Sequence, residues 1–132
     1  MGTAVASIRN MTIHRQRLGE HGESMACDEL ERLGYRIVAR RYRSRFGEID
    51  VVADDEGTVV FVEVKTKTDS SFGDPAEAVT LQKQRRLVSM GEDYVASHRL
   101  DDTPCRFDVV SILFGDGNPL IEVYQNAFEA LC

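Results

Sequence analysis

The sequence predicts a single α/β domain whose elements follow one another in the order αβββαββ. The chain has 132 residues, which is enough for one hydrophobic core and too few for a second domain. Two segments repeat apolar side chains at the three- and four-residue spacing of a helix. Five short apolar segments, separated by turn residues, are typical of strands.

The first helix is predicted over residues 15–33 and ends before Gly34, which suits the position after a helix. Its apolar stripe consists of Leu18, Gly22, Met25, Ala26, Leu30 and Leu33. Residues 1–13 show no periodicity, so we expect a flexible N-terminal tail followed by one domain over residues 14–132.

Glu23 lies at the edge of that apolar stripe. Around a helix it falls within about 20° of Leu30, so its carboxylate should lean toward the core side. Glu20 and Glu31, in contrast, should point to solvent. Glu23 is therefore either a member of a site or a solvated residue at the helix edge.

A meander of three strands is predicted next, over residues 35–42, 49–53 and 58–64. The loop between the second and third strands sets their register. A two-residue loop at Glu56 and Gly57 would place Asp50 opposite Glu63, and a four-residue loop would place the two diagonally. A three-residue loop without a bulge would put them on opposite faces of the sheet.

Asp50, Glu63 and Lys65 are charged residues within this apolar hairpin. Two neighbouring carboxylates repel each other and burial disfavours their ionisation, so such a pair needs a cation or a shared proton. Mg²⁺ or Mn²⁺ is a suitable cation, because Mg²⁺ prefers oxygen ligands and is commonly held by one or two carboxylates plus phosphate oxygens. Lys65 shares a face with Glu63 and could orient a water molecule there. Glu48 is either a further ligand or an exposed residue at a strand start.

The second helix is predicted to begin at Thr80 and to run to about Ser97, with a helix start also over residues 74–77 and a mobile polar loop over residues 68–73. Its expected inward face consists of Leu81, Gln84, Val88, Gly91 and Val95, together with Leu87 and Tyr94.

The last two strands are predicted over residues 106–114 and 120–125, on either side of a turn rich in Gly, Asn and Pro. Asp108 alternates with apolar residues in the first of them. We therefore expect it to be a buried structural residue near Arg106.

The net charge of −6 does not favour a simple basic nucleic-acid binder. The charge is uneven, however: residues 1–49 carry nine Arg and six acidic residues, whereas residues 50–132 carry seven Lys or Arg and sixteen acidic residues. The candidates for phosphate contacts are Arg43, Arg45, Lys67, Lys83 and Arg86. The alternative is that these are ordinary solvated charges.

Five strings, in order, carry a family resemblance: LGEHGESMACDELERLGYRIV, RYRSRFGEID, FVEVKTKT, FGDPAEAVTLQKQRRL and RFDVVSI. Together they resemble the bacterial YraN-like family of endonucleases, which belongs to the PD-(D/E)XK superfamily and is similar to archaeal Holliday-junction resolvases. Asp50, twelve intervening residues and then Glu63-Val64-Lys65 match the superfamily's D…(D/E)xK signature. The resemblance covers roughly residues 17–125.

This resemblance implies a restriction endonuclease-like αβββαβ core, with a mixed central sheet flanked by helices. It implies Asp50 and Glu63 as ligands of Mg²⁺ or Mn²⁺, Glu23 as a supporting ligand, and Lys65 as the residue that assists the attacking water. The implied substrate is DNA, including branched or flapped DNA. Lys83, on the second helix, would contact the DNA backbone, and the resolvase relatives imply a homodimer.

Two other functions fit the same residues. One is a nucleic-acid-binding module that keeps the fold without useful catalysis. The other is a structural hairpin in which Glu63 and Lys65 only form an ion pair, but this would leave Asp50 without a partner in an apolar strand. No apolar run approaches the length of a membrane span, so the expected location is cytoplasmic.

Overall fold

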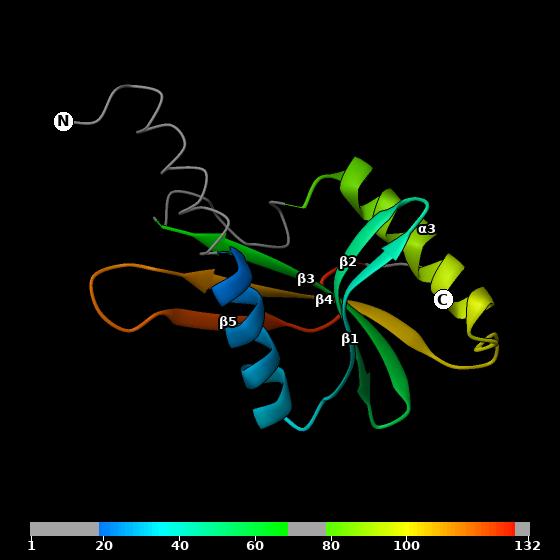
Figure 1. The fold of residues 1–132 in the computed structure, drawn as a ribbon, viewed down its shortest axis with the longest axis horizontal. Helices are drawn as coiled ribbons and strands as arrows, with labels where there is room; N and C mark the ends of the chain where they lie inside the picture. The colour runs from blue at the N-terminus through cyan, green and yellow to red at the C-terminus, as the bar shows by residue number, and fades with distance from the viewer. Residues whose placement is uncertain (1–18, 69–78, 129–132) are drawn as a thin grey trace.

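The computed structural model describes residues 19–68 and 79–128, and it has the predicted α/β architecture (Figure 1). Residues 19–32 are helical. The other elements are β1 (Arg36–Ser44), β2 (Gly47–Asp55), β3 (Thr58–Lys67), α3 (Leu81–Ser97), β4 (Cys105–Leu113) and β5 (Leu120–Tyr124). The predicted N-terminal tail, the polar loop after Thr68 and the helix start over residues 74–77 lie outside the described residues.

The five strands form one mixed sheet in the order β1-β2-β3-β4-β5. Only β3 and β4 run parallel, and α3 lies in the connection between them, as parallel neighbours require a crossover. Asp55 pairs with Thr58, so Glu56 and Gly57 form a two-residue loop with φ values of 51° and 93°. Positive φ at both loop positions is typical of a type I′ hairpin turn. The structure therefore selects the first of the three registers considered from the sequence.

The 19–32 helix and α3 cover opposite faces of the sheet. Ala26 and Leu30 of the 19–32 helix pack in one buried cluster with Val62 of β3. The neighbouring Phe61 points the other way and packs in a second cluster with Leu87 of α3. Because side chains alternate along a strand, these two clusters lie on the two sides of the sheet. Within the described part of the chain, no helix is long and apolar enough to cross a membrane.

β2 and β3 separate from each other partway along their length. Their pairing ends at Val51 and Val62, although both strands continue beyond it. Gly47 of β2 lies against α3, where an added Cβ would be 3.2 Å from Met90 Sδ. The far end of β3 lies instead under the 19–32 helix, and Figure 1 shows the two strand ends on different sides of the molecule. The backbone pairing of the two strands therefore ends one residue before Asp50 and Glu63.

Candidate functional site

Asp50 and Glu63 come together where β2 and β3 separate. Extending the register of Val51 and Val62 by one residue places them opposite each other. Asp50 is partly buried and Glu63 is 5% exposed. The backbone N–H of Val64 donates to Asp50 Oδ2 at 2.8 Å, so Asp50 has a partner. The expectation that a purely structural hairpin would leave Asp50 unpaired is therefore wrong.

The environment of Asp50 disfavours its charged form. Burial chiefly, and then the nearby Glu63 carboxylate, raise its pKa to about 7 from an ordinary value of 3.8. Glu23 adds to the increase, while the Val64 N–H and Lys83 oppose it. Asp50 and Glu63 thus form a pair of carboxylates that need a proton or a cation between them.

Two lysines lie beside Glu63 at different distances. Lys83 Nζ is 2.8 Å from Glu63 Oε1, whereas Lys65 Nζ is 3.6 Å from the same oxygen. Lys83 belongs to the first turn of α3, where its backbone N–H donates to the N-cap residue Thr80. The ammonium nearer to Glu63 therefore comes from the start of α3. Lys83, which the sequence assigned to the DNA backbone, contacts a carboxylate in this structure.

Glu23 is held by Arg41, a residue that the sequence analysis did not single out. Arg41 Nε donates to Glu23 Oε2 at 2.7 Å, and the guanidinium lies 3.8 Å from Glu20. Arg41 has a φ of 51° within β1, a conformation that costs a non-glycine residue about 1–3 kcal/mol. Nothing in the sequence distinguishes Arg41 from the four other arginines between positions 36 and 45.

The irregularity at Arg41 faces Asp50 across the strand pair. The register of β1 and β2 runs from Arg40 and Val51 to Tyr42 and Ile49, which places Arg41 opposite Asp50. In β2 the side-chain alternation also changes here, because Ile49 and Val52 pack on the α3 side while Val51 packs on the other. Both strands therefore deviate from regular geometry at the carboxylate pair.

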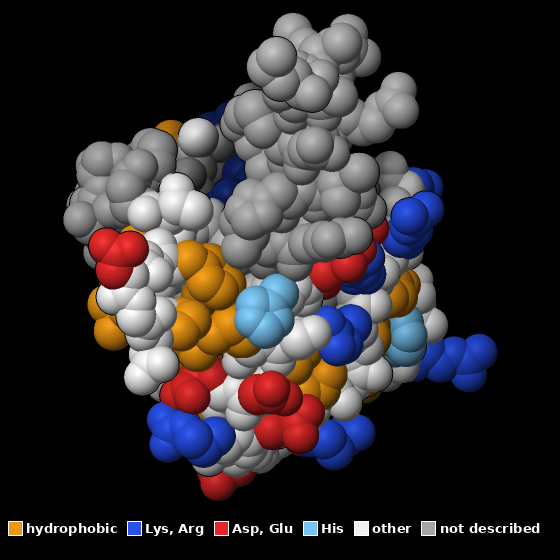
Figure 2. Space-filling view, turned by 60° about the vertical axis from the view of Figure 1, so that its left-hand side comes forward, with side chains coloured by type: hydrophobic (Ala, Val, Ile, Leu, Met, Phe, Trp, Pro, Cys, Tyr) orange, Lys and Arg blue, Asp and Glu red, His pale blue; other side chains and the backbone are white. Residues whose placement is uncertain are grey.

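The other candidate residues lie on or next to the β1–β2 turn, on α3 and at the end of β3. Glu48 pairs with Arg43 at 3.5 Å, and both side chains are exposed. Arg45 stacks on Phe46, Arg86 lies beside Gly47, and Lys67 ends β3. Figure 2 shows acidic and basic side chains interspersed on one face, so charge of a single sign does not dominate there.

The donor set suits a hard cation that keeps some water ligands. In the described part of the chain, no three His, Cys, Asp or Glu side chains gather closely enough to form a complete protein cage for a metal. Mg²⁺ does not need one, because two carboxylates, water and substrate phosphate can complete its ligands. Asp50 and Glu63 therefore fit as its two protein ligands, whereas Glu23 does not lie close enough to complete a set of three among the described residues.

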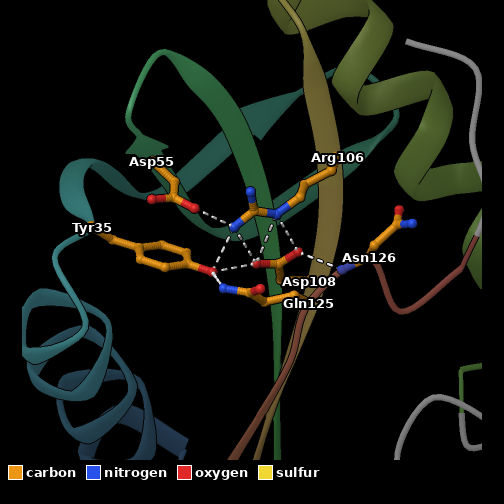
Figure 3. Close-up of polar contacts among 6 residues, drawn as sticks. All are labelled: Tyr35, Asp55, Arg106, Asp108, Gln125 and Asn126. Atoms are coloured by element: carbon orange, nitrogen blue, oxygen red, sulfur yellow. Dashed lines mark hydrogen bonds and ion pairs between the residues drawn. The ribbon is translucent and has the colours of Figure 1, made fainter.

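A second polar cluster lies at the β2–β3 turn, five residues along β2 from Asp50 (Figure 3). Arg106 donates to Asp55 Oδ2 at 2.8 Å and to Asp108 Oδ1 at 3.0 Å. Asp108, which is 1% exposed, also accepts from the Tyr35 hydroxyl at 2.9 Å and from the Asn126 backbone N–H. This network joins the residue before β1, the end of β2, β4 and the segment after β5, and it gives Asp108 the structural role that the sequence predicts.

Comparisons with known proteins identify relatives over nearly the whole chain. A model described as "Uncharacterised protein family UPF0102" matches residues 22–112. A UPF0102 protein of Geobacter metallireducens is 48% identical over 119 residues, which cover 90% of this chain and 98% of the relative. A UPF0102 protein of Symbiobacterium thermophilum is 49% identical over 116 residues, with 87% and 98% covered. One of Caldicellulosiruptor saccharolyticus is 37% identical over 118 residues, with 88% and 100% covered. The chain therefore belongs to the uncharacterised protein family UPF0102, the YraN-like family whose motifs the sequence carries.

Proposed function

We propose that this protein hydrolyses phosphodiester bonds in DNA with Mg²⁺ or Mn²⁺, as a nuclease of the PD-(D/E)XK type. The observation that carries the proposal is the approach of Asp50 to Glu63 where the pairing of β2 and β3 ends, with Lys65 beside Glu63. An ion pair alone would not require the second carboxylate. The order Asp50, Glu63, Lys65 along the chain also matches the signature of that superfamily.

Asp50 and Glu63 would hold the metal ion, and Glu23 would support it. When bound, the ion would polarise a phosphate oxygen and make water a better nucleophile. The raised pKa of Asp50, caused first by burial and then by the Glu63 carboxylate, supports this assignment, because a bound cation would stabilise the charged form that this environment disfavours.

Lys65 would orient the attacking water and offset the negative charge that develops on the phosphate. In the reaction, water loses a proton to solvent as its oxygen bonds to phosphorus, the bond from phosphorus to the leaving sugar oxygen breaks, and that oxygen takes up a proton from solvent. The Lys65 ammonium is suited to this task, because it lies 3.6 Å from Glu63 and is not its nearest cation.

Lys83 would act as the cation of Glu63 in the metal-free protein. Once a metal ion takes that place, the Lys83 ammonium would be released for a DNA phosphate, which reconciles its position with the role expected from the sequence. Arg43, Arg45 and Arg86 would bind further phosphates on the β1–β2 turn side, and Lys67 would do so at the end of β3.

A DNA-binding module without catalysis is the second candidate. It is favoured by the contact of Lys83 with Glu63, because this ion pair balances the buried carboxylate without a metal ion. The resolvase resemblance implies a homodimer, which is compatible with either function. Sedimentation would measure the oligomeric state directly.

A cleavage assay on linear, flapped and four-way-junction DNA with Mg²⁺ or Mn²⁺ tests the proposal. Wild type should cut at least one substrate, EDTA should stop the reaction, and Lys65→Ala should bind DNA without cutting it. Arg99→Ala is a matched control. It also removes one positive charge, but just beyond the C-terminal end of α3, whereas Lys83 lies in the first turn of that helix. Binding without cleavage by wild type would favour the binding module, and equal cleavage by Lys65→Ala would assign the activity elsewhere.

A further inference from the structure

The turn between β1 and β2 presents an aromatic ring to solvent. Phe46 is 42% exposed, although most of the large apolar side chains in the described residues are buried in the two core clusters. The guanidinium of Arg45 lies over its ring, 5.0 Å from the ring centre. The Phe46 backbone N–H donates to Ser44 Oγ at 3.0 Å, which fixes the turn locally. The ring is therefore held at the surface by an ordered turn.

The backbone of this turn rests on α3. Gly47 has a φ of 141°, and an added Cβ would lie 3.2 Å from Met90 Sδ and 3.6 Å from Arg86 Cδ. Glycine allows this conformation and this close approach at the same position. Because the neighbouring residue is fixed against a helix, the Phe46 ring is presented in advance of binding and loses little freedom when a partner arrives.

The chemistry around Phe46 indicates the kind of partner. A docking surface for an apolar protein or a lipid would need a continuous apolar patch. Phe46 is instead flanked by Arg45, and the Arg43 side chain nearby is 87% exposed. A flat ring with one guanidinium over it, and a second guanidinium on the adjoining strand beside Glu48, match a ligand that combines flat rings with negative charges. An unpaired stretch of nucleic acid has both.

We infer that Phe46 stacks on an unpaired nucleobase while Arg43 and Arg45 contact the adjoining phosphates, so that the β1–β2 turn selects single-stranded or branched DNA. This inference rests on the proposed nuclease function and names the substrate feature that the site would recognise. Paired bases are stacked on their neighbours and do not offer a free face to Phe46, whereas flaps, ends and junction openings do.

The turn is close enough to the carboxylate pair to act on the same substrate. Phe46 and Asp50 are four residues apart, about 13 Å along a strand at about 3.3 Å per residue. This corresponds to about four base steps at about 3.4 Å each. The base that stacks on Phe46 would therefore lie within about four nucleotides of the phosphate at Asp50.

The test compares the binding of single-stranded, flapped and duplex DNA of one sequence, measured by fluorescence anisotropy in EDTA so that cleavage cannot occur. Phe46→Ala should weaken binding of the single-stranded and flapped DNA by about 5- to 100-fold, as expected for the loss of one stacked base. Duplex binding should change by less than about threefold. Phe46→Trp should retain the preference, and Leu33→Ala, at an apolar residue with 45% exposure, should change neither.

Scanning 2-aminopurine along the flap gives a second readout, because its fluorescence is quenched where it stacks on the ring. Quenching should occur within about four nucleotides of the cleaved phosphate and disappear in Phe46→Ala. If Phe46→Ala does not fold, Phe46→Leu keeps the apolar bulk without the flat ring and replaces it.

Two results would decide against the inference. An unchanged ratio of single-stranded to duplex affinity in Phe46→Ala would overturn it, whether both affinities stay the same or fall equally. This result leaves the proposed nuclease function standing. Wild type that binds no DNA at all would overturn both the inference and the proposed function.

Discussion

Lys83 Nζ lies 0.8 Å closer to Glu63 Oε1 than Lys65 Nζ does, at 2.8 Å against 3.6 Å. This difference separates the roles of two lysines that have the same charge and face the same carboxylate. The nearer one neutralises Glu63 in the metal-free protein. The farther one, in the D…ExK signature, is the candidate for the chemical step.

Lys83→Met should destabilise the metal-free protein by about 1–3 kcal/mol, because it leaves the Glu63 carboxylate buried without its nearest cation. Lys65→Met should cost about 1 kcal/mol or less, because its contact is longer. Urea unfolding in EDTA measures both. Equal losses in the two variants would show that the distances do not reflect the strengths of the ion pairs.

For turnover we expect the opposite order: Lys65, which contributes less to stability, should matter more than Lys83. Lys65→Ala should lower turnover by about 10²- to 10³-fold, because it removes a positioned charge that acts on the transition state. Metal and DNA affinity should be nearly unchanged, because the ground state depends on Lys65 less. Single-turnover rates at saturating DNA provide the comparison, and a change confined to DNA affinity would contradict the assigned role.

Asp50→Asn should alter how stability depends on pH in the absence of metal. The Asp50 pKa is about 7 in the folded protein and near 3.8 in the unfolded chain, so the folded state holds its proton more tightly. Its contribution to the free energy of unfolding is full below about pH 4 and is lost as the pH rises through about 7. The loss is at most about 4 kcal/mol. Asp50→Asn should therefore match wild type near pH 4 and be more stable near pH 8.

Thermal unfolding in EDTA across this pH range measures the effect, with Asp54→Asn on the same strand as the control. Calorimetry with Mn²⁺ should show that Asp50→Asn no longer binds the ion, because one of the two ligands has lost its charge. Unchanged Mn²⁺ affinity in a folded Asp50→Asn protein would remove Asp50 from the metal site.

DNA affinity should fall steeply as salt increases, with a slope of about −0.9 on a log–log plot for each phosphate neutralised. The double charge reversal Arg43→Glu and Arg45→Glu should flatten this slope by about two phosphates. Arg99→Glu should leave it unchanged. A wild-type slope in the double variant would make the turn arginines ordinary solvated charges.

Most of the fold could be predicted because its signals are local. The β2–β3 hairpin follows from β-branched runs around a Glu-Gly turn, and α3 begins directly after Thr80, where the longer helix was predicted to start. The inward face of α3 was partly wrong: Leu81 is 68% exposed, whereas Met90 is buried. Apolar spacing alone does not reveal which of two adjacent stripes the sheet will cover, since both have the period of a helix.

The sequence singles out the two carboxylates and Lys65, but it does not show which cations reach Glu23 and Glu63 from other elements. Asp50 and Glu63 are conspicuous because they interrupt apolar strands. Arg41 and Lys83 reach Glu23 and Glu63 from other elements, and those contacts depend on how β1 and α3 pack. The sequence does not indicate which carboxylate a surface arginine will contact in the folded protein.

Gly22→Ala should destabilise the protein and disturb the site, because the 19–32 helix crosses β3 at this glycine. In an exposed helix position the change would stabilise by up to about 1 kcal/mol. Here the added Cβ would overlap the Thr66 methyl group on β3, so we expect a loss of about 1–3 kcal/mol. Gly19→Ala is the matched control, because an added Cβ at Gly19 has no neighbour within 4 Å.

The same variant tests the placement of Glu23, the next residue on that helix. If Gly22→Ala moves the helix away from β3, Glu23 moves relative to Asp50, and Mn²⁺ affinity measured by calorimetry should fall. Adding Thr66→Ser removes the overlapping methyl group and should restore both stability and affinity. Equal stability of Gly22→Ala and Gly19→Ala would show that the helix does not approach β3 this closely. Restored stability without restored affinity would instead show that Glu23 is not part of the metal site.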